Sequence, residues 1–566
     1  MSVGTDIDRT FAIKGTSTQA RSTAWSLGAC LLALIVAVPI LAVGAIAFTG
    51  DGTIWSHMMS TVVPRYVANT LLLITLVGAG VLVIGVPTAW LVTMCRFPGR
   101  KIFEIALVLP LAFPAYVISY IYVDLLEYAG PVQVALRDWL SWQRPQDYWF
   151  PEIRSIPGAA LILTSVLYPY VYLMARAAFL DQSTVTIEVG RTLGVSPQRA
   201  FRKISIPLAR PALAIGVALA LMEVLSDFGT VQQLAVDTFT TGIYEVWLGM
   251  NDGGAAAQLA CLLFSFVLLL IWLERSSRRG RRYYPAGRHF RDLPGFEVRG
   301  WRLPATLLIC ALPVAIGFVL PAVVLLSWSI NTSAELSLST YLNDLSNTVL
   351  LAIVAAIVAA LAAIFLSYAL RSASGPLLRT ATRIAGTGYA IPGSVIAVGV
   401  LVPFAWLDNQ IDALMRDWFG ISTGLLISGT MAILVFAYLA RFMALSFGAV
   451  SASFGRVTRN MDGAARTLGH GGWSTLFRVH IPMIRGGVLT AILMVFVEVM
   501  KELPATLILR PFDFNTLATR VYEFASDEQF EEIGIWALSI AAAGIIPVIL
   551  LSMSIRHSRP GHPTDA

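Results

Sequence analysis

The feature that most constrains this chain is a series of long apolar stretches separated by short polar segments. Each stretch reaches the length of about 20 residues that carries a helix across a bilayer. A chain of 566 residues that is 57% hydrophobic and 13% charged is neither a soluble globular protein nor a disordered one. The alternating pattern of outer-membrane strands is absent, so the spans are helices. The sequence predicts an all-α polytopic membrane protein with about 12 transmembrane helices, near residues 27–48, 68–94, 103–126, 158–180, 208–235, 255–273, 304–330, 348–370, 381–407, 422–447, 485–509 and 533–555.

Basic residues distinguish the two sides of the predicted membrane. Arginine and lysine concentrate in the N-terminal segment, in the linker 275–302 and in the tail 556–559, whereas 237–254 and 331–344 contain none. The positive-inside rule therefore predicts that both termini are cytoplasmic. The formal net charge of +6 is explained by this orientation, and nucleic-acid binding is not expected.

The first span also has features of a secretory signal peptide. A positive leader precedes it, and Ala45-Ile46-Ala47 resembles a cleavage site. The apolar run from Leu27 to Phe48 is longer than a signal core and contains that motif, which favours an uncleaved first span.

A polar loop with the same internal spacing occurs twice. The first copy reads Glu188-Val-Gly-Arg-Thr-Leu-Gly194 and the second Gly463-Ala-Ala-Arg-Thr-Leu-Gly469, each followed thirteen residues later by a proline. At the same separation along the chain, further identities pair Pro207 with Pro482, Arg210 with Arg485, Glu223 with Glu498, Phe239 with Phe514 and Thr241 with Thr516. Earlier in each half, Asn69 pairs with Asn347 and Pro114 with Pro392 at a slightly larger separation, so a small gap lies between the two blocks.

The duplication predicts two transmembrane halves around a basic linker. An even number of spans separates the copies, so they are parallel pseudo-repeats with the same orientation. The expected segments are a cytoplasmic N-terminal segment, a first transmembrane domain of about six spans, a basic cytoplasmic linker, a second transmembrane domain of about six spans and a cytoplasmic tail: 1–26, 27–273, 274–303, 304–555 and 556–566.

The sequence lacks the phosphate-binding motif with which many transport proteins bind ATP. No Gly-x-x-x-x-Gly-Lys-Ser/Thr motif occurs, because none of the four lysines, Lys14, Lys101, Lys203 and Lys501, follows a glycine in that pattern. Metalloprotease and serine-hydrolase motifs are also absent, which disfavours an intramembrane enzyme. We expect no catalytic residue in this chain.

The two polar loops resemble the EAA loop of binding-protein-dependent ABC importer permeases. The resemblance covers nearly the whole chain as two fused permease domains and implies the type I importer fold in a bacterial inner membrane. It implies two copies of an ABC ATPase subunit on the cytoplasmic side, which carry the ATP and Mg²⁺, and an external solute-binding protein. This chain itself is expected to bind no cofactor.

The resemblance also implies which residues couple the permease to its ATPases. Each loop would form a coupling helix seated on an ATPase, and the residues at the motif positions are Glu188, Gly190, Arg191, Gly194, Pro207, Asp462, Ala465, Arg466, Gly469 and Pro482. Gly463 stands where the first copy has Glu188, and Asp462 lies one place earlier. Whether Asp462 substitutes for that carboxylate is left open by the sequence.

Two carboxylates follow each loop at positions i and i+4 of a predicted span. They are Glu223 and Asp227 in the first half and Glu498 and Glu502 in the second. Charges within a bilayer are costly and usually face a partner or a water-filled path, so these four predict a passage of oxygen ligands for a cationic cargo. The alternative is local neutralisation, since Lys501 lies three residues after Glu498.

Several runs resemble fused permeases of bacterial ferric iron importers. They include Val499-Met-Lys-Glu-Leu-Pro-Ala-Thr506 and Asp237-Thr-Phe-Thr-Thr-Gly-Ile-Tyr244. The resemblance implies Fe³⁺ as cargo, delivered by a periplasmic iron-binding protein, and with it transient Fe³⁺ at Glu223 and Glu498. Thiamine, polyamine, sulfate and phosphonate permeases share the EAA loop and remain alternatives, as does a secondary transporter driven by an ion gradient.

The segment 127–157 is rich in aromatic residues and is predicted to be external. We expect it to lie at the membrane interface as an aromatic belt, or to contact an external partner.

Overall fold

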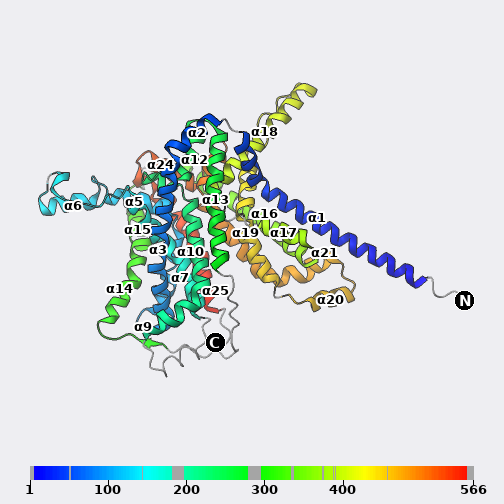
Figure 1. The fold of residues 1–566 in the computed structure, drawn as a ribbon, viewed down its shortest axis with the longest axis horizontal. Helices are drawn as coiled ribbons and strands as arrows, with labels where there is room; N and C mark the ends of the chain where they lie inside the picture. Colours follow the sequence, from blue (N-terminus) through cyan, green and yellow to red (C-terminus); the bar gives the residue numbers. More distant parts are fainter. Residues whose placement is uncertain are drawn as a thin grey trace. The chain divides into compact units, whose positions relative to one another are not determined.

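The computed structural model of this chain describes residues 6–49, 52–142, 144–180, 197–277, 295–332, 337–372, 375–386, 388, 391–455 and 457–557. Apart from one pair of two-residue strands, its regular elements are helices (Figure 1). Eleven helices in these residues are long and apolar enough to cross a membrane, and a bent helix pair raises the number to 12 if it is one span. The predicted all-α polytopic class is therefore confirmed.

The bent pair lies where the sequence predicts the third span. It joins Arg100–Ala112 to Ala115–Leu140 at an angle of 89°. Pro114 lies at the break with an extended backbone (φ −62°, ψ 142°) and precedes the first turn of the next helix. Pro392, its predicted counterpart, has nearly the same geometry (φ −57°, ψ 144°) before another helix. A proline at this position has no amide hydrogen to leave unsatisfied, so the two breaks have one physical cause.

The contacts divide the chain into two compact units. Unit 1 comprises Met1–Thr49 and Leu345–Asn515, and unit 2 comprises Gly50–Asp344 and Thr516–Ala566. Each unit contains residues from both predicted halves of the sequence. The first helix of the chain groups with helices of the second half. The first span of the second half likewise belongs with helices of the first.

In unit 2, α3 packs against α7, and α10 packs against α7 and α13 (Figure 1). The helix α15 packs on α25, the last helix of the chain. The elements of this unit are α2 (Gly52–Thr61), α3 (Val63–Met94), β1 (Cys95–Arg96), α4 (Arg100–Ala106), η1 (Leu109–Ala112), α5 (Ala115–Leu126), α6 (Pro131–Leu140), η2 (Pro145–Asp147), α7 (Ile156–Leu180), α9 (Pro197–Ala200), η3 (Phe201–Ser205), α10 (Ile206–Ser226), α11 (Gly229–Gln233), α12 (Phe239–Tyr244), η4 (Glu245–Gly249), α13 (Gly253–Ser277), β2 (Phe296–Glu297), α14 (Arg302–Val314), η5 (Ala315–Val319), α15 (Leu320–Asn331), α24 (Leu517–Ser526), η8 (Phe530–Ile533) and α25 (Gly534–His557). The strands β1 and β2 pair in parallel, with Cys95 opposite Phe296.

In unit 1, α1 lies against α17 and α18, and α19 packs against α22. The core between these helices is rich in alanine, which lets helix backbones approach closely in a membrane. The elements of this unit are α1 (Asp6–Thr49), most of α16 (Leu338–Ser372), α17 (Pro376–Ala385), α18 (Gly393–Phe419), α19 (Met431–Phe454), α20 (Arg459–Thr467), α21 (Gly472–Thr475), η7 (Leu476–His480), α22 (Ile481–Met500) and α23 (Pro504–Leu509).

The predicted duplication recurs in the local geometry. Asn69 donates a side-chain hydrogen bond to the carbonyl of Asp237 (2.8 Å), and Asn347 donates one to the carbonyl of Asn515 (3.1 Å). A π-helical turn precedes the proline of each loop segment, at η3 before Pro207 and at η7 before Pro482. The two halves therefore repeat hydrogen bonds and helix irregularities as well as sequence.

The geometry corrects one part of the sequence alignment. The amides of Thr238 and Thr516 each donate a hydrogen bond to the hydroxyl of the threonine three residues later, at 2.9 and 2.8 Å. Thr516 is therefore the counterpart of Thr238, and the predicted pairing with Thr241 is wrong. After the short helices α11 and α23, equivalent residues of the two repeats are again as far apart in sequence as Asn69 and Asn347. The second half therefore contains a short insertion at this point.

The approach of α3 to α7 depends on Gly85. A methyl group added there would lie 2.9 Å from the β-carbon of Val171 and 3.0 Å from the carbonyl of Tyr168. We expect Gly85→Ala to lower the free energy of unfolding by about 1–3 kcal/mol through overpacking. Thermal unfolding of the purified protein in detergent measures this. The control is Gly448→Ala on α19, where nothing lies within 4 Å, and an equal loss in both variants would contradict the prediction.

Candidate functional site

The second predicted coupling loop forms a helix, a turn and a second helical segment. The first helix, α20, holds Asp462, Ala465 and Arg466. The turn uses Gly469, whose φ of +82° is unfavourable for residues with a side chain. After the short helix α21 and the π-turn η7, Pro482 is the second residue of α22. The predicted stop at a glycine is present, whereas the helix runs through η7 into α22 without a break at the proline.

Asp462 is held by two partners from other elements of unit 1. Its Oδ2 accepts a hydrogen bond from Nε of Arg371 at 2.8 Å, and its Oδ1 lies 2.7 Å from Nε2 of His480. Arg371, at the end of α16, also donates to the carbonyls of Val457 and Thr458. This network ties the start of the loop helix to the ends of two spans.

The charge on Asp462 is stabilised by these contacts. Burial by itself raises the pKa of this carboxyl group, but the hydrogen bonds from Arg371 and His480 outweigh burial and hold the pKa below its ordinary value of 3.8. The side chains of Asp462 and Arg371 are 19% and 17% exposed. The ion pair is therefore only weakly screened by solvent.

Aromatic rings support this network and extend to the protein surface. His480 packs between Tyr368 and Phe454, each with a ring-centroid distance of 5.6 Å. The Tyr368 hydroxyl also donates to the carbonyl of Gly472. Three large apolar side chains of the loop segment are mostly exposed: Leu468, Trp473 and Phe477. An anchored loop that presents apolar side chains is suited to contact with another protein.

Most of the first predicted loop lies outside the described residues. This applies to Glu188, Gly190, Arg191 and Gly194. Pro207 is described and lies in the first turn of α10, directly after η3. The basic residues just before it, Arg199, Arg202 and Lys203, are exposed.

In unit 1, Glu502 lies in the break between α22 and α23. Its side chain is 2% exposed and pairs with Nη1 of Arg441 on α19 at 2.7 Å. The same carboxylate accepts hydrogen bonds from the amides of Ala505 and Thr506 at 2.9 and 3.0 Å, and from the Thr506 hydroxyl at 2.6 Å. It thus satisfies the first amides of α23, which would otherwise have no partner within the membrane.

In unit 2, Asp227 occupies the matching break between α10 and α11. It accepts hydrogen bonds from the Thr230 hydroxyl at 2.8 Å and the Val231 amide at 3.1 Å. Asp227 and Glu502 thus both accept hydrogen bonds from the start of the short helix that follows each break, at matching positions of the two repeats. In the described part of the chain, an ion pair is recorded for Glu502 and none for Asp227.

The remaining two predicted carboxylates lie one helical turn earlier. Glu498 on α22 pairs with Lys501 at 3.0 Å, which is the neutralising contact that the sequence spacing offers as an alternative. Glu223 lies at the matching position of α10 and is half-buried. The structure therefore places the two carboxylates of each repeat on one helix and its end, and the role of all four in transport stays a prediction.

Three residues that hold these sites were not identified from the sequence. They are Arg371, His480 and Arg441. Arg441 could have been identified from the sequence, because it is a charged residue within an otherwise apolar span. Arg371 and His480 could not have been identified in this way, since basic residues are common near the cytoplasmic ends of spans.

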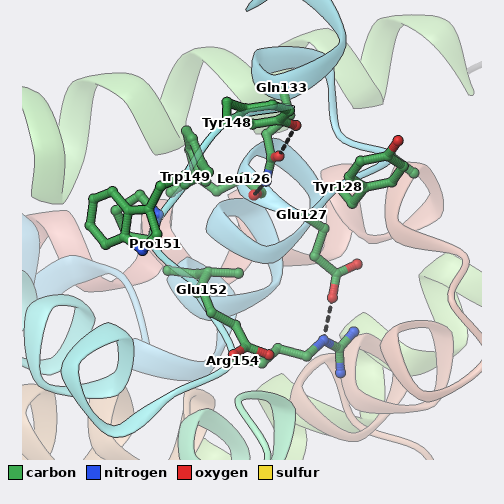
Figure 2. A pocket seen from close by; sticks show the side chains of 12 residues that line it. Leu126, Glu127, Tyr128, Gln133, Tyr148, Trp149, Pro151, Glu152 and Arg154 are labelled. Atoms are coloured by element: carbon green, nitrogen blue, oxygen red, sulfur yellow. Dashed lines mark hydrogen bonds and ion pairs between the residues drawn. The ribbon is translucent and has the colours of Figure 1, made fainter. Parts of the chain in front are cut away.

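The segment after α5 forms an open cavity of about 550 Å³ in unit 2 (Figure 2). Its walls include Tyr128, Tyr148 and the exposed Trp149. Figure 2 shows Glu127 and Arg154 pointing toward one another, and they form an ion pair. Arg154 also donates to the carbonyl of Gln233 at the end of α11. The predicted external aromatic segment is thus joined to the short helix that Asp227 caps.

Among the described residues there is no group of three or more His, Cys, Asp or Glu side chains that could hold a metal ion. The repeated breaks, the anchored loop and the candidate spans together define a multi-pass helical membrane protein with an internal repeat.

Comparison with known proteins agrees with this class. Residues 81–282 match the family described as binding-protein-dependent transport system inner membrane component. The Fe(3+)-transport system permease protein FbpB 2 of Haemophilus influenzae is 26% identical over 86% of this chain and 88% of its own length. The ferric transport system permease protein FbpB of Actinobacillus pleuropneumoniae is 23% identical over 86% of this chain and 70% of its own. The molybdenum transport system permease protein ModB of Escherichia coli is 29% identical, over 34% of this chain and 86% of its own length.

Over residues 81–282 the chain thus resembles the inner membrane component of binding-protein-dependent transport systems, and over 86% of its length it is similar to ferric transport permeases. These similarities indicate the membrane subunit of an ABC importer, a class that works with ATPase subunits and a solute-binding protein.

The Asp462 network gives a prediction for the anchored loop. We expect Asp462→Asn to weaken the hold of Arg371 and His480 by about 1–3 kcal/mol, since hydrogen bonds to a charged group are lost. Amide hydrogen exchange within α20 should then become faster. Because the folded pKa lies below 3.8, the stabilisation is present above that value and is lost as the pH falls through the folded pKa.

The control for this variant is Asp417→Asn, which removes an exposed carboxylate from α18 in the same unit. Exchange within α20 should be unaffected there. Unchanged exchange in Asp462→Asn would show that the network does not hold the loop.

Proposed function

We propose that this permease moves Fe³⁺, delivered by an external iron-binding protein, into the cytoplasm. Two separate ATPase subunits drive the transport through the two polar loops. ATP and Mg²⁺ belong to those subunits, and both termini lie in the cytoplasm with the loops. The observation that carries the choice of cargo is the extent of similarity: a ferric permease matches 86% of this chain, whereas the molybdenum permease matches 34%.

The chemistry of the breaks in the two spans supports a cationic cargo. Four carboxylates stand at repeated positions within or at the ends of α10 and α22. Carboxylate oxygens are hard ligands that suit a hard cation, and a passage that contains them repels an anion such as sulfate. A sulfate permease of Salmonella typhimurium is 27% identical over 45% of this chain, so this electrostatic difference separates two related cargo classes.

The geometry of the second loop supports coupling to a separate protein. Its polar side is anchored by Arg371 and His480, while Leu468 and Trp473 are 77% and 60% exposed. A force applied to those exposed side chains is transmitted to α16 and α22, because the ion pair joins the loop helix to both. The first loop is proposed to act in the same way through Arg191, Gly194 and Pro207.

Reconstitution tests the proposed function directly. The permease is placed in vesicles with its ATPase, and candidate binding proteins are added outside, either empty or loaded with Fe³⁺, sulfate or thiamine. We expect ATP-dependent uptake only with the iron-loaded protein. If a binding protein loaded with another ligand stimulates ATP hydrolysis instead, that ligand is the cargo and the ferric assignment is wrong. Uptake driven by an ion gradient without ATP would overturn the importer mechanism.

The pathway residues are tested in the same vesicles. We expect Glu223→Gln combined with Glu498→Gln to lower the initial rate of ferric uptake about tenfold, since two negative charges no longer stabilise the cation. The control is Glu274→Gln at the end of α13. The prediction fails if the double variant, assembled with its ATPase, takes up iron at the normal rate.

A further inference from the structure

Hydrogen bonds hold the walls of the open cavity in the segment after α5, which has a volume of about 550 Å³ (Figure 2). The Tyr148 hydroxyl donates to Oε1 of Gln133 at 2.5 Å, and Nε2 of the buried Gln133 donates to the carbonyl of Leu126 at 2.8 Å. Arg137 on α6 donates to the carbonyl of Tyr128 at 2.8 Å, and its guanidinium lies over the Tyr128 ring at 4.1 Å. The cavity is therefore preformed, and a partner that enters it has little ordering cost to overcome.

The lining of this cavity combines aromatic rings with carboxylates. The rings are those of Tyr128, Tyr148, Trp149 and Phe150. The carboxylates belong to Glu127 and Glu152, and the only cation among the described lining residues, Arg154, pairs with Glu127. Glu152 is exposed, and no ion pair of its side chain is recorded in the described part of the chain. Aromatic faces beside an unneutralised carboxylate are the chemistry that binds a cationic side chain.

The exposure of Trp149 indicates a protein partner. This side chain lines the cavity and is 85% exposed. Large aromatic side chains of this kind are the usual anchors of protein interfaces. Lipid fits the cavity poorly, because acyl chains would have to remove water from the charged groups of Glu152 and Arg154. A protein that presents a lysine or an arginine matches both the rings and the charge.

Arg154 connects the cavity to the short helix α11. Its Nε pairs with Glu127, and its Nη1 donates to the carbonyl of Gln233 at 3.2 Å. Gln233 is the last residue of α11, so its carbonyl has no donor within that helix. Arg154 thus holds the end of the helix whose start is capped by Asp227. A cation that binds Glu127 competes with Arg154 for the carboxylate and so changes how α11 is held.

We propose that this cavity is the docking site for a basic side chain of the external solute-binding protein, and that Glu127 and Arg154 transmit docking to α11. The proposal rests on the proposed importer function, in which that protein is the partner on the external side. The partner is identified by its chemistry: a lysine or an arginine enters between the aromatic rings and pairs with Glu127 and Glu152.

The aromatic part of the site is tested by affinity. The permease is assembled with its ATPase in lipid nanodiscs, and binding of the solute-binding protein that supports uptake in the vesicles is measured. We expect Trp149→Ala to weaken this binding about tenfold, since an anchoring ring is lost. The control is Trp139→Ala on α6, because Trp139 is 80% exposed but does not line the cavity. Equal affinity of the two variants would overturn the docking site and leave the segment to the lipid surface.

The charge of the site is tested in the same assay at low and high salt. We expect Glu152→Gln to weaken binding severalfold and to make it less dependent on salt, because one attractive charge is lost. Asp138→Asn removes an exposed carboxylate of α6 that lies outside the cavity lining, and should change neither quantity. Tighter binding by Glu152→Gln would show that the partner presents an acidic group, and the proposal would be wrong.

Transmission to α11 is separated from docking by Arg154→Lys. Lysine keeps a positive charge for Glu127, but it lacks the planar fork with which arginine bonds to Glu127 and to the Gln233 carbonyl at once. We expect normal affinity for the solute-binding protein together with severalfold weaker stimulation of ATP hydrolysis. A misfolded variant would lose both, and full stimulation would show that docking does not act through Arg154.

The results distinguish this site from the proposed function. If Trp149→Ala and Glu152→Gln bind normally while ferric uptake continues, the docking site is wrong and the importer function stands. If a binding protein loaded with another ligand supports uptake, the ferric cargo is wrong, and the same variants should weaken the docking of that protein. If the wild-type complex binds no loaded solute-binding protein, both the site and the importer function are wrong.

Discussion

The interaction on which most of this structure depends is the capping of a backbone break by a carboxylate inside the membrane. When a helix stops within a bilayer, its successor begins with amides that water cannot reach. Asp227 and Glu502 supply the missing acceptors for α11 and α23. A carboxylate solves the hydrogen-bonding problem but introduces a charge, and the two repeats treat that charge differently. Glu502 is paired with Arg441, whereas Asp227 is held by hydrogen bonds from Thr230 and Val231.

The same balance of charge and burial operates at the cytoplasmic loop. Asp462 sits close to the position of the family carboxylate, but its oxygens face Arg371 and His480 of its own unit. The carboxylate therefore anchors the loop, while Leu468, Trp473 and Phe477 form the exposed surface. Anchoring and exposure thus fall to different side chains of the loop, and in the proposed coupling the ion pair is what links that surface to the spans.

Sequence alone predicted the features that depend on local composition. Apolar length predicted the spans, and spacing offered the contact of Glu498 with Lys501 as an alternative to a pathway role. The breaks at Pro114 and Pro392 were not predicted, because the expected spans 103–126 and 381–407 run through both prolines. Arg371 and Arg441 were also missed, because their partners Asp462 and Glu502 lie 91 and 61 residues away and no local pattern links them. The sequence also did not predict that the first helix of each half groups with helices of the other half, because apolar composition does not specify which spans pack together.

Fusion of two repeats in one chain makes such asymmetry physically accessible. If two identical subunits formed the permease, each corner would carry the same carboxylate, and a neutralising arginine on one would appear on both. Here each corner occurs once, so Arg441 can neutralise Glu502 without affecting Asp227. A buried ion pair adds little net stability compared with apolar packing, but it fixes the position of its members. One repeat can therefore pair the carboxylate at its break with an arginine, while in the described residues the carboxylate at the other break is held by hydrogen bonds, which is a difference that duplication followed by fusion permits.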